Sequence, residues 1–145
     1  AATTLCAAIR AQFTYVPGAT KVDTSPGEAF KLKKGVCQDF THVMIVALRS
    51  LDIPAGYVSG FLRTIPPAGK PRLEGADAMH AWVRVWCGVH TGWVEFDPTN
   101  AMLAGADHIT IGHGRDYADI SPIVGVLRTS GGHETKQSVD VVRVE

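Results

Sequence analysis

The stretch Gly35-Val36-Cys37-Gln38-Asp39-Phe40 places a single thiol where a glycine turn gives way to a strongly apolar segment. From Cys37 to about Leu51, apolar residues follow helical spacing and also fill the opposite side, which predicts a buried central helix that ends before Pro54. A cysteine at a helix start lies at the positive end of the helix dipole, beside backbone N–H groups without intrahelical acceptors. This setting favours the thiolate, which is the nucleophilic form of cysteine.

Two shorter helices are predicted before this segment. Leu5, Ile9 and Phe13 recur every four residues, as in the apolar stripe of an amphipathic helix. Ser25-Pro26-Gly27-Glu28 matches a capping box, with the serine as N-cap and the proline at the first helical position. We expect this second helix to end near Lys33-Lys34-Gly35, with the glycine in the left-handed conformation.

The rest of the chain predicts strands. The candidates are Ala55–Arg63, Ala78–Cys87, Gly92–Asp97, His108–Ile111, Val124–Leu127 and Ser138–Val144. Helices followed by strands indicate an α+β domain, in which a mainly antiparallel sheet packs on the buried central helix. The segment between Thr64 and Asp77 is rich in proline and glycine, and a long irregular loop of this kind is often functional.

Strand alternation brings His80 and Asp97 to the same face of the predicted sheet. A hairpin around Gly88-Val89 would place His80 directly opposite Asp97, with Cβ atoms about 4.5–5.5 Å apart. A carboxylate can reach an imidazole over that separation, whereas a slip of one residue would turn Asp97 to the other face. The same register pairs Ala81 with Phe96, Val83 with Val94, Trp82 with Glu95 and Arg84 with Trp93.

Cys37, His80 and Asp97 stand in the order of a nucleophile, its base and the group that orients the base. Each has an ordinary alternative: a small buried thiol, a strand histidine, and a turn residue before proline. The combination is far more specific than any one residue, so we interpret the three as a catalytic triad. Cys6 on a helical stripe and Cys87 on the core face of a strand are predicted to be structural.

The other polar and aromatic residues give weaker signals. Asp39 is explained by the helix dipole, and His42 stands at a poor facing distance from Cys37, so both are interpreted as structural. The aromatic residues Trp82, Trp86 and Trp93 fit either solvent-side packing or a cleft wall. The segment Gly112–Tyr117 is predicted to be a turn held by an Arg–Asp pair, with an active-site wall as the alternative. We name Trp82, Gln38 and Tyr117 as candidate walls of a substrate cleft.

Composition narrows the classes of function. The 145 residues suit one domain with a real core, and 14 basic residues balance 14 acidic ones, so no basic field recommends nucleic acid or an anionic membrane. Three cysteines argue against a disulfide framework, and the six histidines show no zinc-site spacing. We therefore expect no cofactor, no metal and a reducing, cytoplasmic setting.

Three segments resemble the bacterial transglutaminase-like superfamily: Gly35 to His42, Ala78-Met79-His80-Ala81-Trp82-Val83, and Trp93 to Asn100. The resemblance implies a papain-like cysteine-peptidase fold and an acyl-enzyme mechanism through a thioester. It also implies that residues 1–145 are the catalytic domain of a longer protein, from which an N-terminal β-rich domain is missing.

The expected activity is hydrolysis of a peptide or related amide bond in a protein or peptide substrate. Transamidation of the transglutaminase type is the alternative within the enzyme class. The alternatives of another class are a non-catalytic peptide-binding or scaffold module, and a metal site in which Cys37, His80 and Asp97 chelate zinc.

Overall fold

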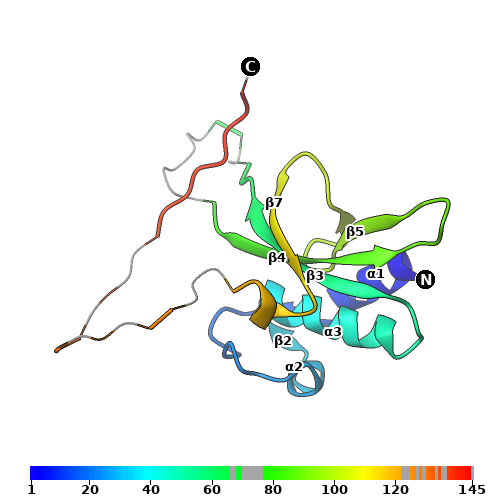
Figure 1. Cartoon of the computed structure of the whole chain (residues 1–145), viewed down its shortest axis with the longest axis horizontal. Helices are drawn as coiled ribbons and strands as arrows, with labels where there is room; N and C mark the ends of the chain where they lie inside the picture. The colour runs from blue at the N-terminus through cyan, green and yellow to red at the C-terminus, as the bar shows by residue number, and fades with distance from the viewer. Residues whose placement is uncertain are drawn as a thin grey trace.

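The computed structural model describes residues 1–65, 68–69, 77–121, 125–126, 128, 130–132, 134 and 137–144. Its elements are α1 (Ala2–Gln12), β1 (Thr14–Tyr15), α2 (Pro26–Leu32), β2 (Lys34–Gly35), α3 (Cys37–Arg49), β3 (Ala55–Leu62), β4 (Met79–Trp86), β5 (Trp93–Asp97), β6 (Met102–Leu103), β7 (His108–Gly114) and the 3-10 helix η1 (Tyr117–Asp119). Strands β3 to β7 form one antiparallel sheet in the order β6-β5-β4-β3-β7, and the helices lie against one face of it (Figure 1). The predicted α+β architecture is confirmed.

The core lies between α3 and the sheet. Phe40, Met44 and Leu48 of α3 are fully buried against apolar side chains of β3, β4 and β5. Phe13, at the end of α1, completes the core with an edge-on contact to the Phe40 ring, 5.4 Å between ring centroids. The expectation that α3 is apolar and buried nearly all round is wrong at Val46, which is half exposed and lines a hollow together with Ala8 of α1 and Phe30 of α2.

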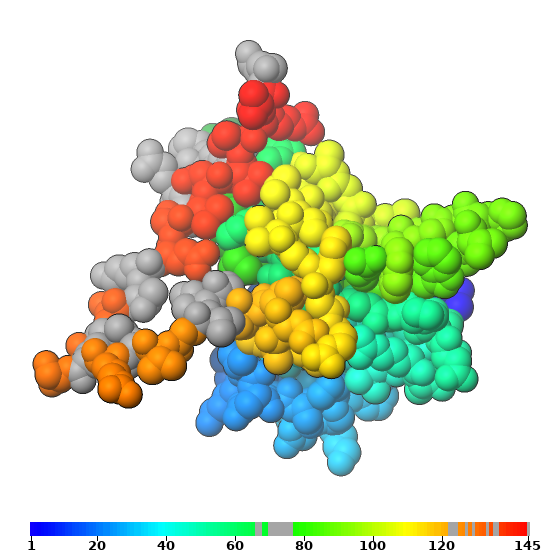
Figure 2. All heavy atoms as spheres, viewed as in Figure 1, coloured from blue at the N-terminus to red at the C-terminus, as the bar shows by residue number. Residues whose placement is uncertain are grey.

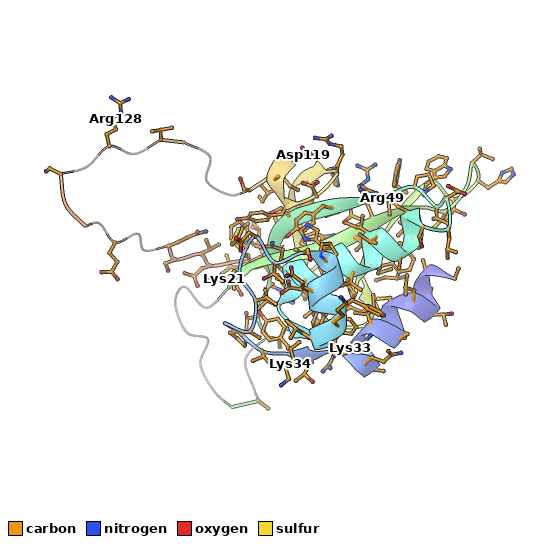
Figure 3. The ribbon with its side chains drawn as sticks, turned by 90° about the horizontal axis from the view of Figure 1, so that it is seen from below. Lys21, Lys33, Lys34, Arg49, Asp119 and Arg128 are labelled. Carbon is orange, nitrogen blue, oxygen red and sulfur yellow. The ribbon has the colours of Figure 1, made fainter. Side chains whose placement is uncertain are left out.

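The capping box at Ser25 and the end of α2 near Lys33 are confirmed, but the residue in the left-handed conformation is not the expected one. Lys33, with φ of 53°, adopts the left-handed conformation that we expected of Gly35. The Lys33 ammonium lies over the Phe30 ring, 3.4 Å from its centroid, which gives this lysine a cation–π contact in its left-handed position. Figure 3 labels Lys33 and Lys34 beside α2.

The hairpin of β4 and β5 has a longer loop than expected. Trp86 pairs with Trp93, and Val83 pairs with Phe96, a register shifted by two residues from the predicted one. Gly88 and Gly92 both have positive φ, and the Gly92 N–H donates to the Gly88 carbonyl, so the connection contains a turn that the two-residue hairpin lacks. A shift of two keeps every side chain on its predicted face but makes His80 a diagonal neighbour of Asp97, not a directly opposed one.

The five-stranded sheet is strongly curled, which brings β7 toward β5. β7 is separated from β5 by β3 and β4, about 14 Å in a flat sheet. Two histidines of β7 nevertheless reach carboxylates of β5, and β7 crosses over the sheet in Figure 1. Gly60 of β3 makes this possible, because a Cβ there would overlap the Ile109 carbonyl and the Trp82 ring.

The last segment does not form the expected strand. Residues 138–144 have no regular structure, and the segment lies beside the start of β4 (Figure 2). The buried Asp77 holds it there: its carboxylate accepts from the backbone N–H groups of Val141 and Thr64, and its own N–H donates to Val139. The expected strand Val124–Leu127 begins and ends outside the described residues. Cys87 follows the end of β4 and is exposed, so its prediction as a core residue is wrong.

Replacing Gly60 by alanine tests the curl. The Cβ would press on backbone, so we expect Gly60→Ala to lower the free energy of unfolding by roughly 1–3 kcal/mol, the usual cost of overpacking. Gly27→Ala is the matched control, because Gly27 lies in the first turn of α2, where an added Cβ would meet no atom within 4 Å. Urea denaturation of both variants measures the difference, and equal midpoints would contradict the close contact.

Candidate active site

Cys37 begins α3, and hydrogen bonds made by the residues around it fix its position. The short parallel pair β1–β2 ties the preceding segment down, and the Val16 N–H donates to the Gly35 carbonyl. The buried Asp39 carboxylate accepts from the Val36 N–H at 2.8 Å and from the Thr20 hydroxyl at 2.7 Å. Asp39 therefore shapes the turn before the cysteine, in addition to its predicted place at the positive end of the helix.

Gly35 is required at this turn by close approach, not by backbone conformation. A Cβ on Gly35 would overlap the Asp39 side chain. The glycine in front of the cysteine thus leaves room for the carboxylate that holds the Val36 N–H. Together these contacts determine where the half-buried Cys37 side chain points.

His80 connects the sulfur to a carboxylate. Its Nε2 lies 2.8 Å from Oδ2 of Asp97, and its ring lies close enough to the Cys37 side chain for that group to raise the His80 pKa. The exposed fractions of the His80 and Asp97 side chains are 9% and 0%. The structure therefore brings together the three residues that strand alternation and the helix start predicted, whereas their roles in catalysis stay a prediction.

Asp97 is surrounded by donors. Oδ2 accepts from His80, from His108 at 3.1 Å and from the Asn100 side chain at 2.7 Å, while Oδ1 accepts from the Thr99 and Asn100 backbone N–H groups. Burial alone would raise the Asp97 pKa, but the hydrogen bonds from His108, His80 and Asn100 and the charge of His80 outweigh it and hold the pKa well below its usual range. Asp97 is therefore a carboxylate that accepts and does not donate.

His80 holds its proton strongly. Burial alone would lower its pKa, but hydrogen bonds to Asp97 and Cys37, and the negative charges of both, outweigh burial and raise the pKa to about 9. Since Asp97 can only accept, Nε2 of His80 donates to it. Nδ1 is then the ring nitrogen left for the sulfur of Cys37.

The other two cysteines differ from Cys37. Cys6 is buried, and its Sγ donates to the backbone carbonyl of Asp97 at 3.3 Å. Burial, followed by the nearby charge of Asp97, raises the pKa of the Cys6 thiol to about 11, which favours an inert structural thiol, as predicted. Cys87 is an ordinary exposed thiol.

The candidate cleft residues separate into two groups. Trp82 is fully buried, and its Nε1 donates to Glu95 at 2.6 Å, so our expectation of a cleft wall is wrong there because the curled β7 covers this face. Tyr117 borders a hollow of about 650 Å³ with Val22 and Asp116. The Gln38 side chain donates to the Val22 carbonyl at 2.9 Å, and therefore lies beside the same hollow.

The turn after β7 is held differently than expected. Arg115 pairs with Asp119, at 2.8 Å between Nη2 and Oδ1, and not with Asp116, whose carboxylate caps the backbone of η1. Arg49 of α3 donates to the Arg115 carbonyl, and Arg49 and Asp119 lie on the same side of the molecule (Figure 3). His42 accepts from the Tyr117 N–H at 3.2 Å, which agrees with its structural interpretation.

Sequence reasoning missed Asn100 and His108. Asn100 follows Asp97 by three residues, and an aspartate with a polar residue at that spacing is a usual turn signal that could have indicated the contact. His108 was predicted only as the first residue of a strand. Nothing local in the sequence indicates its contact with Asp97, because the contact depends on the curl of the sheet.

The fold and this geometry place the chain among known proteins. Residues 1–98 match the Transglutaminase-like superfamily, and the chain belongs to that superfamily. It is 43% identical to the uncharacterized protein Rv2569c of Mycobacterium tuberculosis over 145 residues, which cover 97% of this chain and 46% of the relative. It is 39% identical to the uncharacterized protein ML0607 of Mycobacterium leprae over 137 residues, 93% of this chain and 47% of the relative. The chain thus spans about half the length of these relatives.

A solved structure supports the same placement. The chain resembles a crystal structure from Cytophaga hutchinsonii described as a "Putative Cysteine Protease", with a TM-score of 0.69 and 28% identity. The match covers 83% of this chain and 37% of the other. The chain therefore has the general fold of a cysteine enzyme of the transglutaminase-like kind. Within the described residues, the helices are all too short or too polar to cross a bilayer.

The raised pKa of His80 gives a stability prediction with a definite sign. A group with a folded pKa of about 9 and an unfolded pKa near 6.5 contributes stability that is fully present below pH 6.5 and lost as pH rises through 9. Between pH 6 and pH 9.5 we expect the wild type to lose on the order of 3 kcal/mol more stability than His80→Gln. Urea denaturation under reducing conditions measures both, and parallel losses in the two proteins would contradict the raised pKa.

Proposed function

We propose that this domain is a cysteine-dependent acyl-transfer enzyme that hydrolyses a peptide or related amide bond. The observation that carries the proposal is the hydrogen bond between the His80 ring and the buried Asp97 carboxylate, with Cys37 near enough to the same ring to raise its pKa. A histidine that accepts a proton readily, beside a thiol at a helix start, favours a thiolate–imidazolium pair. Membership of the superfamily and the likeness to the Cytophaga structure support the same class of reaction.

The residues suit two half-reactions. In the first, the Cys37 thiolate attacks the amide carbonyl, the C–N bond breaks, and the leaving amine takes the proton from His80 as a thioester forms. In the second, neutral His80 takes a proton from water as its oxygen attacks the thioester carbonyl, and the C–S bond breaks. The carboxylic acid leaves, and the Cys37 thiolate and protonated His80 are regenerated. Asp97 keeps the imidazole oriented and stabilises its charged form throughout.

The first turn of α3 supplies one donor for the developing oxyanion. Cys37 occupies the first helical position, where the backbone N–H has no acceptor four residues earlier within the helix. Such N–H groups stabilise the negative oxygen of a tetrahedral intermediate.

We propose that the substrate is a peptide or protein segment lying along the hollow beside Gln38 and Tyr117. The need for a reduced thiol is the reason to propose the cytoplasm as the setting.

The reactivity of Cys37 tests the proposal directly. An ordinary thiol has a pKa of about 8.5 and is mostly protonated at pH 6.5. At that pH we expect iodoacetamide to label Cys37 roughly 10-fold or more faster than Cys87. The exposed Cys87 serves as an internal control, and the buried Cys6 should stay unlabelled in the folded protein. His80→Ala should remove the advantage of Cys37, as followed by peptide mass spectrometry. Equal labelling of Cys37 and Cys87, indifferent to His80, would sink the proposal in favour of a scaffold.

The fate of the acyl group distinguishes hydrolysis from transamidation. A mixture of peptides that contain glutamine, incubated with and without a fluorescent primary amine, should yield cleaved or deamidated products that Cys37→Ala does not form. Cys87→Ser should retain the activity, because Cys87 lies away from the triad. Incorporation of the amine in preference to water would overturn hydrolysis and assign transamidation.

A further inference from the structure

The buried imidazole of His108 lies against the triad but takes no part in the two half-reactions. Its side chain is 1% exposed, and its Nε2 lies 3.1 Å from Oδ2 of Asp97, the same oxygen that His80 contacts. The Trp82 ring packs edge-on against the His108 ring, with 5.1 Å between the ring centroids, and restricts its movement. A buried polar ring in this position calls for a defined hydrogen-bonding role.

The backbone decides which nitrogen of His108 carries the ring proton. The Gly105 N–H donates to Nδ1 of His108 at 3.2 Å, and a backbone N–H can only donate, so Nδ1 must present its lone pair. Nε2 then carries the hydrogen and donates it to Asp97. His108 is thereby fixed in one neutral tautomer by a contact outside the triad.

This tautomer argues against a metal site at the same place. His80, Asp97 and His108 offer ligand atoms within 4.8 Å of one another, a spacing that could hold a metal ion. A histidine that binds metal through Nε2 normally donates its Nδ1–H to an acceptor, whereas Nδ1 of His108 faces a donor. The three residues are arranged for hydrogen bonding among themselves.

We propose that His108 is a positioning residue, a neutral donor that keeps the Asp97 carboxylate ionised and turned toward His80. The inference rests on the proposed function, and it adds His108 as a fourth residue to the proposed triad of Cys37, His80 and Asp97. A neutral donor stabilises the carboxylate without adding a second positive charge, which leaves His80 as the group that carries the charge opposite the thiolate. Trp82 and the curl at Gly60 hold the donor in place.

The sequence offers a matched control on the same strand. His113 at the other end of β7 also contacts a carboxylate of β5, with Nε2 3.1 Å from Oε1 of Glu95. That pair is partly exposed, 41% for the histidine and 27% for the glutamate. The distance is the same as in the His108 pair, but His113 contacts Oε1 of Glu95, whereas Trp82 donates to Oε2 of that carboxylate. The loss of His113 therefore leaves the Trp82 contact in place and should leave Cys37 unaffected.

The test compares His108→Leu, His108→Gln and His113→Gln by the rate of Cys37 alkylation between pH 5 and pH 8. The leucine of His108→Leu fills much of the space of the imidazole but has no hydrogen-bond donor. We expect its rate of Cys37 alkylation to fall by roughly 10- to 100-fold, the usual effect of a misplaced catalytic group. Glutamine places an N–H donor near the position of Nε2, so His108→Gln should recover most of the rate. His113→Gln should match the wild type. Equal losses in both folded His108 variants would show that shape alone matters and would overturn the proposal.

A second measurement on the wild type does not depend on the variants folding. Long-range ¹H–¹⁵N spectra of the histidine rings at pH 7.5 should show Nδ1 of His108 without hydrogen and Nε2 with it. The other neutral tautomer, or a doubly protonated ring, would overturn the proposal. Slow alkylation of Cys37 in the wild type would instead refute the proposed function, whereas fast wild-type alkylation that His108→Leu leaves unchanged would refute the role of His108 alone.

Discussion

The burial of the Asp97 carboxylate is the constraint on which the sheet side of the structure depends. A carboxylate with no exposed surface stays ionised only where hydrogen bonds replace the water it has lost. Its donors come from three places: His80 on β4, the turn after β5, and His108 on β7. Satisfying one buried charge therefore requires strands that are not neighbours to converge, and this agrees with the curl of the sheet over Trp82.

A second buried carboxylate organises the helix side. Asp39 joins the start of α3 to the loop that contains Thr20 and fixes the turn in front of Cys37. The two carboxylates act on different parts of the same site, one on the turn before Cys37 and the other on His80. Neither is replaceable by an apolar residue of the same shape without leaving backbone or imidazole N–H groups unpaired.

Local patterns predicted the elements that carry Cys37, His80 and Asp97, since the period of a helix and the alternation of a strand are properties of short segments. The common face of His80 and Asp97 survived an error of two residues in the register, because a two-residue shift preserves alternation. The actual register depends on the positive φ of both Gly88 and Gly92, whereas the predicted hairpin turned at Gly88-Val89 alone. The capping role of Lys33, the burial of Trp82 and the contact of His108 all depend on packing between side chains, which a local pattern does not contain.

Asp77 has a consequence for how such a domain can diversify. Its carboxylate accepts from the backbone of Thr64, so the two ends of the proline-rich segment are fastened to each other directly in front of β4. The cost of closing a loop rises only slowly with its length once the ends are held. Residues can therefore be gained, lost or exchanged between positions 64 and 77 without moving the histidine that follows. Freedom to vary the length and sequence of this segment and retention of the position of His80 thus lie on opposite sides of a single aspartate.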